Sequence, residues 1–164
     1  MLLWESTKAE FVWEGSWRDI CIPDVGVEEW GSAVKALVRT GMDGRFTING
    51  TEAAMPEDIA QVFARPTDTA VLWSVTVTGV QLNCHFFGAS EIEFDLDPRE
   101  ITGQPQLDGV LGFMRTLAGA SGRTALMTPE NMHEVPFIRV AASGKSDYIP
   151  SDGFFEELAR GRSG

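Results

Sequence analysis

The chain has 164 residues, of which 43% are hydrophobic and 23% are charged, a composition typical of one globular domain with its own core. Its formal net charge of −11 argues against a protein that binds nucleic acid through phosphate contacts, because such proteins carry the opposite charge. The longest stretch without a charged residue, 69–90, alternates polar and apolar residues, which is typical of strands and argues against a membrane helix there.

Two features of the sequence indicate a cytoplasmic protein. The chain begins without the basic flank and apolar run of a signal peptide. Its two cysteines, Cys21 and Cys84, lie far apart and in no metal-binding or redox spacing, which favours a reducing compartment. Arginine outnumbers lysine and glycine is abundant, so we expect a bacterial source with a GC-rich genome. We expect no contact with membranes or nucleic acid.

The first predicted element is a β-hairpin over residues 11–22, with Gly15 and Ser16 in a two-residue turn. This pairing places Trp17 and Asp19 on the face opposite the core. Trp17 is there a candidate anchor for a protein interface, because large aromatic residues contribute much of the binding energy at interfaces. Cys21 is also expected to point outward, with no activating neighbour.

The next elements are a long helix over residues 28–40, a short strand over 45–49 and a short helix over 56–65. Apolar residues recur at helical spacing in the first helix, with acidic residues near its start and basic residues near its end. The second helix is bounded by Pro56, which suits a first turn, and by Pro66, which ends it.

Three strands are then predicted over residues 73–78, 81–87 and 91–97, because each alternates polar and apolar residues. A two-residue turn at 79–80 and a three-residue turn at 88–90 connect them. Because a one-residue slip would mix the two faces, this register sets Asn83 beside Asp95 and places His85 between Ser74 and Glu93.

A second long helix is predicted over residues 104–120, with one apolar stripe. Gly109, Gly112 and Gly119 lie off this stripe, and either they let another element approach closely or they are merely tolerated. Strands over 123–127 and 137–141 and a short helix over 152–160 follow, and residues 161–164 form a frayed tail.

These elements predict a single α+β domain over residues 1–160. A mostly antiparallel sheet carries the two long amphipathic helices packed on one face. The segments 18–45 and 92–123 resemble each other faintly, since each reads as a strand, a helix and a second strand. Two pseudo-repeated strand–helix–strand halves would explain this similarity, and so would chance.

The outer face of the third central strand is acidic, with Glu91, Glu93, Asp95 and Asp97 in one row. Same-face neighbours on a strand are about 6.7 Å apart. Each like-charge pair then repels by roughly 0.6 kcal/mol in water and by about 2.5 kcal/mol at an effective dielectric of ~20. Three interpretations remain open: a solvated face or protected edge strand, a surface for a basic protein partner, or a metal or catalytic site.

The metal interpretation uses His85, Glu93 and Asp95, because an imidazole beside carboxylates suits a transition metal, whereas carboxylates alone suit Ca²⁺ or Mg²⁺. Ser74, His85 and Glu93 also have the residue types of a nucleophile, a base and an orienting acid, but the chain has no Gly-x-Ser-x-Gly motif. His133 lies in a polar loop over 128–136, which is either functional or an ordinary surface loop.

The leading hypothesis is a non-catalytic binding protein whose acidic sheet face engages a basic protein partner, as immunity and inhibitor proteins do, by analogy of size and charge alone. The predicted binding residues are Glu91, Glu93, Asp95, Asp97, His85, Asn83 and Trp17. The alternatives are a metal-binding domain or metal-dependent hydrolase, and a soluble domain whose polar face is merely solvated. The sequence contains no enzyme motif and predicts no cofactor, but it leaves a divalent cation open.

Overall fold

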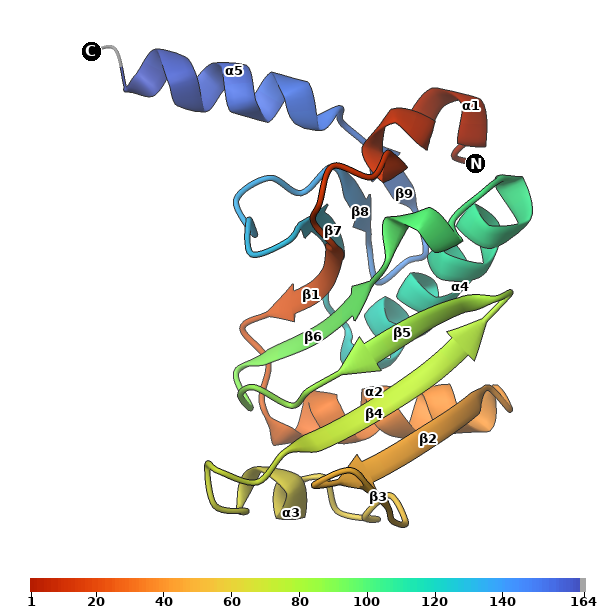
Figure 1. The fold of residues 1–164 in the computed structure, drawn as a ribbon, viewed down its shortest axis with the longest axis vertical. Helices are drawn as coiled ribbons and strands as arrows, with labels where there is room; N and C mark the ends of the chain where they lie inside the picture. The colour runs from red at the N-terminus through yellow and green to blue at the C-terminus, as the bar shows by residue number, and fades with distance from the viewer. Residues whose placement is uncertain (163–164) are drawn as a thin grey trace.

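The fold is built around one sheet in which neighbouring strands run antiparallel (Figure 1). The computed structural model describes residues 1–162, so the last two positions of the predicted tail lie outside it. Within these residues the sheet has nine strands in the order β3-β2-β4-β5-β6-β1-β7-β8-β9. Their bounds are β1 Arg18–Pro23, β2 Asp43–Ile48, β3 Thr51–Glu52, β4 Val71–Val77, β5 Val80–Cys84, β6 Glu91–Leu96, β7 Ala125–Pro129, β8 Ile138–Val140 and β9 Ser146–Tyr148.

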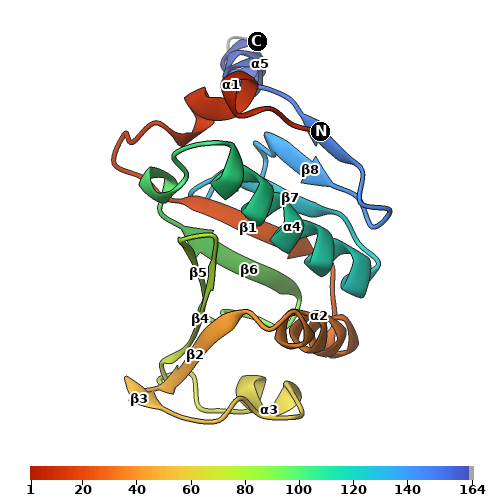
Figure 2. The same cartoon turned by 90° about the vertical axis from the view of Figure 1, so that its right-hand side faces the viewer.

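Two long helices, α2 and α4, lie on the same side of this sheet and pack against each other (Figures 1 and 2). The helical segments are α1 Trp4–Thr7, η1 Lys8–Phe11, α2 Val27–Arg39, α3 Ala60–Phe63, η2 Pro98–Glu100, α4 Gln104–Ser121 and α5 Ser151–Gly161. The predicted α+β class, with its antiparallel sheet and helices on one face, is confirmed. We call the sheet surface opposite α2 and α4 the open face.

The first long helix, α2, begins and ends at the signals expected from the sequence, and α4 ends at a glycine. Before the first turn of α2, the Glu29 carboxylate accepts the backbone N–H of Gly26 at 2.9 Å, and Arg39 lies in the last turn. α4 ends at Gly122, whose φ of 67° is readily adopted by glycine. The buried stripes that result are Trp30, Ala33, Val34 and Leu37 in α2 and Leu107, Val110, Leu111, Met114, Leu117 and Ala118 in α4.

A close contact between α4 and the β4–β5 turn explains one of the helix glycines. A Cβ atom at Gly109 would lie 3.0 Å from Thr78 Cβ and 3.3 Å from Val77 Cγ1. A Cβ atom at Gly112 would meet nothing within 4 Å. Gly109 therefore permits the close approach of the turn, whereas Gly112 is a tolerated weakness of the helix.

The turn between β4 and β5 differs from the prediction by its position. Thr78 and Gly79, with φ of 50° and 80°, form the two-residue turn, so Ser74 pairs with Asn83 and not with His85. Positive φ at both turn positions matches the twist of the flanking strands, which makes this turn favourable. The register shifts by two residues, which leaves the polar and apolar faces as predicted.

The strand β5 ends before His85, so the predicted pairing of His85 with Glu93 does not form. The predicted pairing of Asn83 with Asp95 is confirmed. At Phe86 the chain takes a φ of 54° and the side chain enters the core, where its ring centroid lies 5.4 Å from that of Trp30. Burial of this aromatic ring is the physical reason that the strand is shorter than its alternation suggests.

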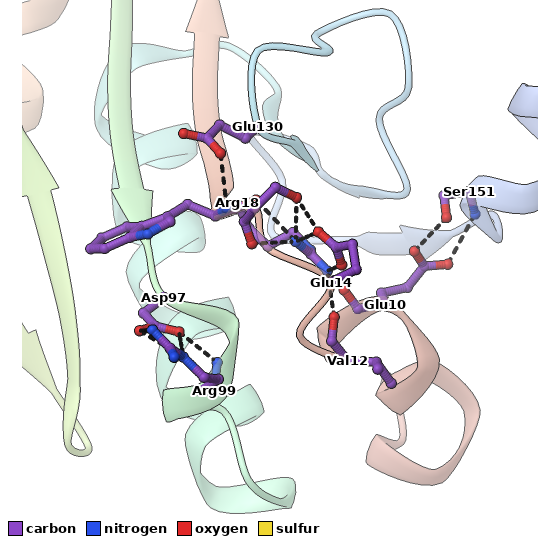
Figure 3. A network of polar contacts seen from close by, with 10 residues as sticks. Glu10, Val12, Glu14, Arg18, Asp97, Arg99, Glu130 and Ser151 are labelled. Carbon is purple, nitrogen blue, oxygen red and sulfur yellow. Dashed lines mark hydrogen bonds and ion pairs between the residues drawn. The ribbon is translucent and has the colours of Figure 1, made fainter.

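The predicted hairpin over residues 11–22 is wrong, because the segment before β1 forms helical turns and a loop around a buried cation (Figure 3). The guanidinium of Arg18 donates hydrogen bonds to the carbonyl oxygens of Glu10, Val12 and Ser16 at 2.7, 3.1 and 3.0 Å. It also pairs with the Glu14 carboxylate at 2.8 Å. Satisfying a buried guanidinium in this way requires a curved backbone, which a strand cannot supply.

Two strand–helix–strand units, β1–α2–β2 and β6–α4–β7, share the sheet. Their first strands lie side by side at its centre and run antiparallel, with Ile20 opposite Phe94. Their second strands occupy different places, since β7 lies next to β1 whereas β4, β5 and β6 separate β2 from β1. The two units therefore share their connectivity but not their positions in the sheet.

The smaller elements follow the prediction less closely. Within residues 56–65 the helix is only α3, whereas α5 extends one residue further at each end than predicted. The position 161 is helical, and residues 163–164 of the predicted tail lie outside the described residues. The N-terminus and α5 lie at the same end of the molecule, where α5 extends from the body (Figures 1 and 2).

Candidate functional site

The open face carries three carboxylates on β6, Glu91, Glu93 and Asp95, which we call the acidic row. They alternate with buried apolar residues that point towards the helices. The side chains of Glu91 and Asp95 are 32% and 26% exposed, so the row lies in a shallow, half-solvated position. Within residues 1–162, no lysine or arginine lies within ion-pair distance of the acidic row.

Asp97, predicted as the fourth member of the row, is instead the cap of η2. Its carboxylate accepts the backbone N–H of Arg99 at 2.9 Å and pairs with the Arg99 guanidinium at 2.8 Å (Figure 3). These hydrogen bonds and the charge of Arg99 hold the pKa of the Asp97 carboxyl below its usual value. Asp97 is thus neutralised locally and adds little to the charge of the open face.

The neighbouring strand β1 adds two further groups to the open face. Asp19 lies opposite Asp95, and Cys21 lies opposite Glu93, and both are almost completely buried. Burial raises the pKa of the Asp19 carboxyl. Burial and the carboxylates around it raise the pKa of the Cys21 thiol, so the thiol stays protonated and unreactive.

The loop over residues 130–137, between β7 and β8, covers this part of the open face. The Glu130 carboxylate accepts the backbone N–H of Trp17 at 3.0 Å (Figure 3), and Asp19 Oδ2 accepts the backbone N–H of Asn131 at 2.8 Å. Trp17, the predicted anchor, is half-buried immediately before β1. These contacts hold the loop against β1 and bring His133 towards the acidic row.

His133 approaches two carboxylates with its two ring nitrogens. Nδ1 lies 2.8 Å from Glu91 Oε1, and Nε2 lies 3.5 Å from Asp19 Oδ2. Both are ion-pair distances, but the ring is turned so that neither contact is a hydrogen bond, and His133 Nε2 and Glu91 Oε1 are buried without a hydrogen-bond partner. The imidazole is therefore close to two acids but incompletely satisfied by them.

His85 and Asn83 both contact Asp95. His85 Nε2 lies 3.2 Å from Asp95 Oδ2, and its ring stacks on Phe87 at 5.1 Å between centroids. Asn83 donates to Asp95 Oδ1 at 3.0 Å and accepts from the Ser74 hydroxyl at 2.9 Å. The Ser74 hydroxyl therefore bonds to Asn83 and not to His85. The arrangement of Ser74, His85 and Glu93 as nucleophile, base and acid, considered from the sequence, does not form.

The groups that could hold a metal ion differ from the predicted set of His85, Glu93 and Asp95. The structure brings His85 to Asp95 but brings Glu93 towards Asp19. Burial and then the charge of Asp19 raise the pKa of the Glu93 carboxyl. The described sets whose ligand atoms all lie within 4.8 Å of one another are Asp19, Glu93 and His133, and Cys21, Glu91 and His133.

Sequence reasoning placed Asp19 on the outer face and His133 in a functional or ordinary loop, but it did not connect either residue with the acidic row. The connection depends on the pairing of β1 with β6 and on the path of the loop over 130–137. The signal available in the sequence was the alternation of Asp19 and Cys21, which matches the polar face of the acidic strand.

Comparison of the chain with protein-family models, with curated proteins and with solved structures found no match. Among the described residues, the helices are all too short or too polar to cross a membrane.

Proposed function

We propose that the protein is a non-catalytic binding protein that engages a basic protein partner through the acidic row on its open face. The observation that carries this proposal is that Glu91, Glu93 and Asp95 stand together without a lysine or arginine in ion-pair range among the described residues. Of the three, Glu91 and Asp95 each have a histidine as their ion-pair partner.

The spacing of the acidic row supports a cationic partner. Same-face neighbours on a strand lie about 6.7 Å apart, and each pair repels by roughly 0.6 kcal/mol in water, rising to about 2.5 kcal/mol at an effective dielectric of ~20. Lysine or arginine side chains from a partner would offset this repulsion as they exclude water from the face. The net charge of −11 would also speed the encounter with a basic protein.

The side chains around the row support binding over catalysis. Asn83 is buried and fixes Asp95, and Ser74 donates to Asn83. These polar groups hold the Asp95 carboxylate in place for a partner. We further propose a reducing, cytoplasmic and bacterial setting, supported by the two free cysteines and the arginine-rich composition.

Binding of a lysine- and arginine-rich peptide to isotope-labelled protein, followed by NMR in the presence of EDTA, tests this proposal. We expect shifted amide signals on β1, β5 and β6, and an affinity that falls as salt is raised. Glu93→Gln with Asp95→Asn should weaken binding about tenfold, which corresponds to a loss of ~1.4 kcal/mol.

The matched control removes the same charge from exposed positions away from the acidic row, with Glu57→Gln and Asp68→Asn. This control should bind the peptide nearly as well as the wild type. If both double variants lose the same affinity, only the overall charge matters, and the open face is merely a solvated surface.

A further inference from the structure

The imidazole of His133 has a buried nitrogen that the protein leaves without a hydrogen bond. His133 belongs to the loop over 130–137, and its buried Nε2 atom lies 3.5 Å from Asp19 Oδ2. Nδ1 lies on the other side of the ring, at 2.8 Å from Glu91 Oε1. Buried polar atoms in folded proteins nearly always have a hydrogen-bond partner or a ligand, so we expect this ring nitrogen to bind one.

Two carboxylates and the imidazole of His133 converge at this place. Ligand atoms of Asp19, Glu93 and His133 all lie within 4.8 Å of one another. Ligands of a zinc ion, bound at about 2.0–2.2 Å in a tetrahedral arrangement, are ~3.3–3.6 Å apart. The separation of 3.5 Å between Asp19 and His133 already fits this geometry, and the third ligand atom needs a shift of roughly 1.2–1.5 Å at most.

The local negative charge also favours a bound cation. The Asp19 side chain is only 3% exposed, and among the described residues its ion-pair partner is His133 and no lysine or arginine. With Glu93 beside it, the two carboxylates carry two negative charges when both are ionised. A divalent cation would neutralise them, whereas two unneutralised carboxylates in a partly buried position cost free energy.

We propose that Asp19, Glu93 and His133, through its Nε2 atom, form a binding site for one divalent transition-metal ion, with Zn²⁺ as the reference ion. An imidazole with two carboxylates suits Zn²⁺ and similar ions, whereas Ca²⁺ and Mg²⁺ prefer oxygen ligands alone. Glu91, which faces Nδ1, is the positioning residue, because a ligating histidine commonly turns its other nitrogen towards a carboxylate.

This site does not depend on the proposed partner-binding function. It shares Glu93 with the acidic row, but it also requires Asp19 and His133, which are not members of that row, and it does not require Asp95 or His85. Three protein ligands leave a fourth position for water or for a group from another molecule.

The test uses protein without an affinity tag, stripped with EDTA and titrated with Zn²⁺ by calorimetry. We expect one ion per chain and a rise of several degrees in the unfolding temperature once Zn²⁺ is well above its dissociation constant. Asp19→Asn and His133→Gln should each weaken Zn²⁺ binding by about tenfold or more. His85→Gln is the matched control, since His85 also faces a carboxylate of the open face, and it should bind Zn²⁺ like the wild type.

Imidazole NMR gives a second readout, because His85 and His133 are the only histidines of the sequence. Zn²⁺ should shift one imidazole, and that signal should persist in His85→Gln. Absence of Zn²⁺ binding, equal loss in His85→Gln and His133→Gln, or a shift of the His85 ring alone would each overturn the proposal. Ca²⁺ and Mg²⁺ serve as negative probes. Glu93→Gln, at the ligand whose side chain makes no hydrogen bond with the loop among the described residues, keeps the test decisive if His133→Gln or Asp19→Asn disturbs the loop.

Discussion

Two charged residues near the N-terminus are buried, and each organises the chain around it (Figure 3). Arg18 donates to backbone carbonyl oxygens and pairs with Glu14. Glu10 accepts hydrogen bonds from the Tyr148 hydroxyl and the Ser151 backbone, both at 2.9 Å. A buried charge without such partners costs several kcal/mol, so these contacts select the local backbone.

Replacing Glu14 by Gln should reduce stability at neutral pH but not in acid. The hydrogen bond from Arg18 lowers the pKa of the Glu14 carboxyl below the value near 4.5 expected for the unfolded chain. The stabilisation is therefore complete above the unfolded pKa and is lost as pH falls through the lowered, folded pKa. Because the Glu14 side chain is 54% exposed, we expect a loss of less than about 1 kcal/mol in urea unfolding at neutral pH.

The control for this prediction is Glu5→Gln, which removes an exposed ion pair with Lys8. It should change stability by only a few tenths of a kcal/mol at any pH. A Glu14→Gln loss that stays the same from neutral to about pH 3 would show that the charge of Glu14 is not responsible.

At the scale of elements, α4 contains two glycines whose surroundings differ. Gly109 faces the β4–β5 turn at a separation that leaves no room for a methyl group, whereas Gly112 faces open space. Helix propensity treats these two positions alike, because it reflects only the backbone and the lost side-chain entropy. The neighbouring turn distinguishes them.

Gly112→Ala should raise the free energy of unfolding by up to about 1 kcal/mol, because alanine favours the helix. Gly109→Ala should lower it by about 1–3 kcal/mol, because the new Cβ atom crowds Thr78 and forces α4 and the turn apart. Chemical unfolding of the two variants side by side measures both effects. Equal stabilisation by both changes would mean that the turn moves aside freely.

At the scale of the whole molecule, Glu10 links segments that are far apart in the sequence. Its carboxylate joins η1 to β9 through Tyr148 and to the start of α5 through Ser151. α5 has no buried residue, and it extends from the body of the molecule (Figure 1). Glu10 is therefore a principal attachment of the C-terminal helix.

Glu10→Gln should loosen this attachment, because the charged acceptor of three hydrogen bonds is lost. We expect faster amide hydrogen exchange in α5 and β9 and unchanged exchange in α2. Burial and the hydrogen bond to Glu10 raise the pKa of Tyr148, the only tyrosine of the chain, so its absorbance titration should move towards the usual value in Glu10→Gln. Glu156→Gln, on the exposed surface of α5, is the control, and an identical exchange pattern in both variants would refute the link.

Local patterns predicted those parts of the fold that local physics decides. The long helices follow from apolar spacing and end signals, and the alternation of β6 follows from burial of one face. Matching of the faces also predicted the register of Asn83 with Asp95. The predicted β4–β5 register was wrong by two residues. Thr78 takes a positive φ, which is uncommon for a β-branched residue, so the sequence does not predict this turn position.

The sequence by itself determined the fold class, the net charge and the presence of carboxylates on one face of a strand, because these depend on composition and on spacings of a few residues. Only the tertiary structure decided which residues join those carboxylates. The pairing of β1 with β6 brings Asp19 to them, and the loop over 130–137 adds His133. Such pairings join segments far apart in the chain through burial of the whole sheet, and no local pattern encodes them.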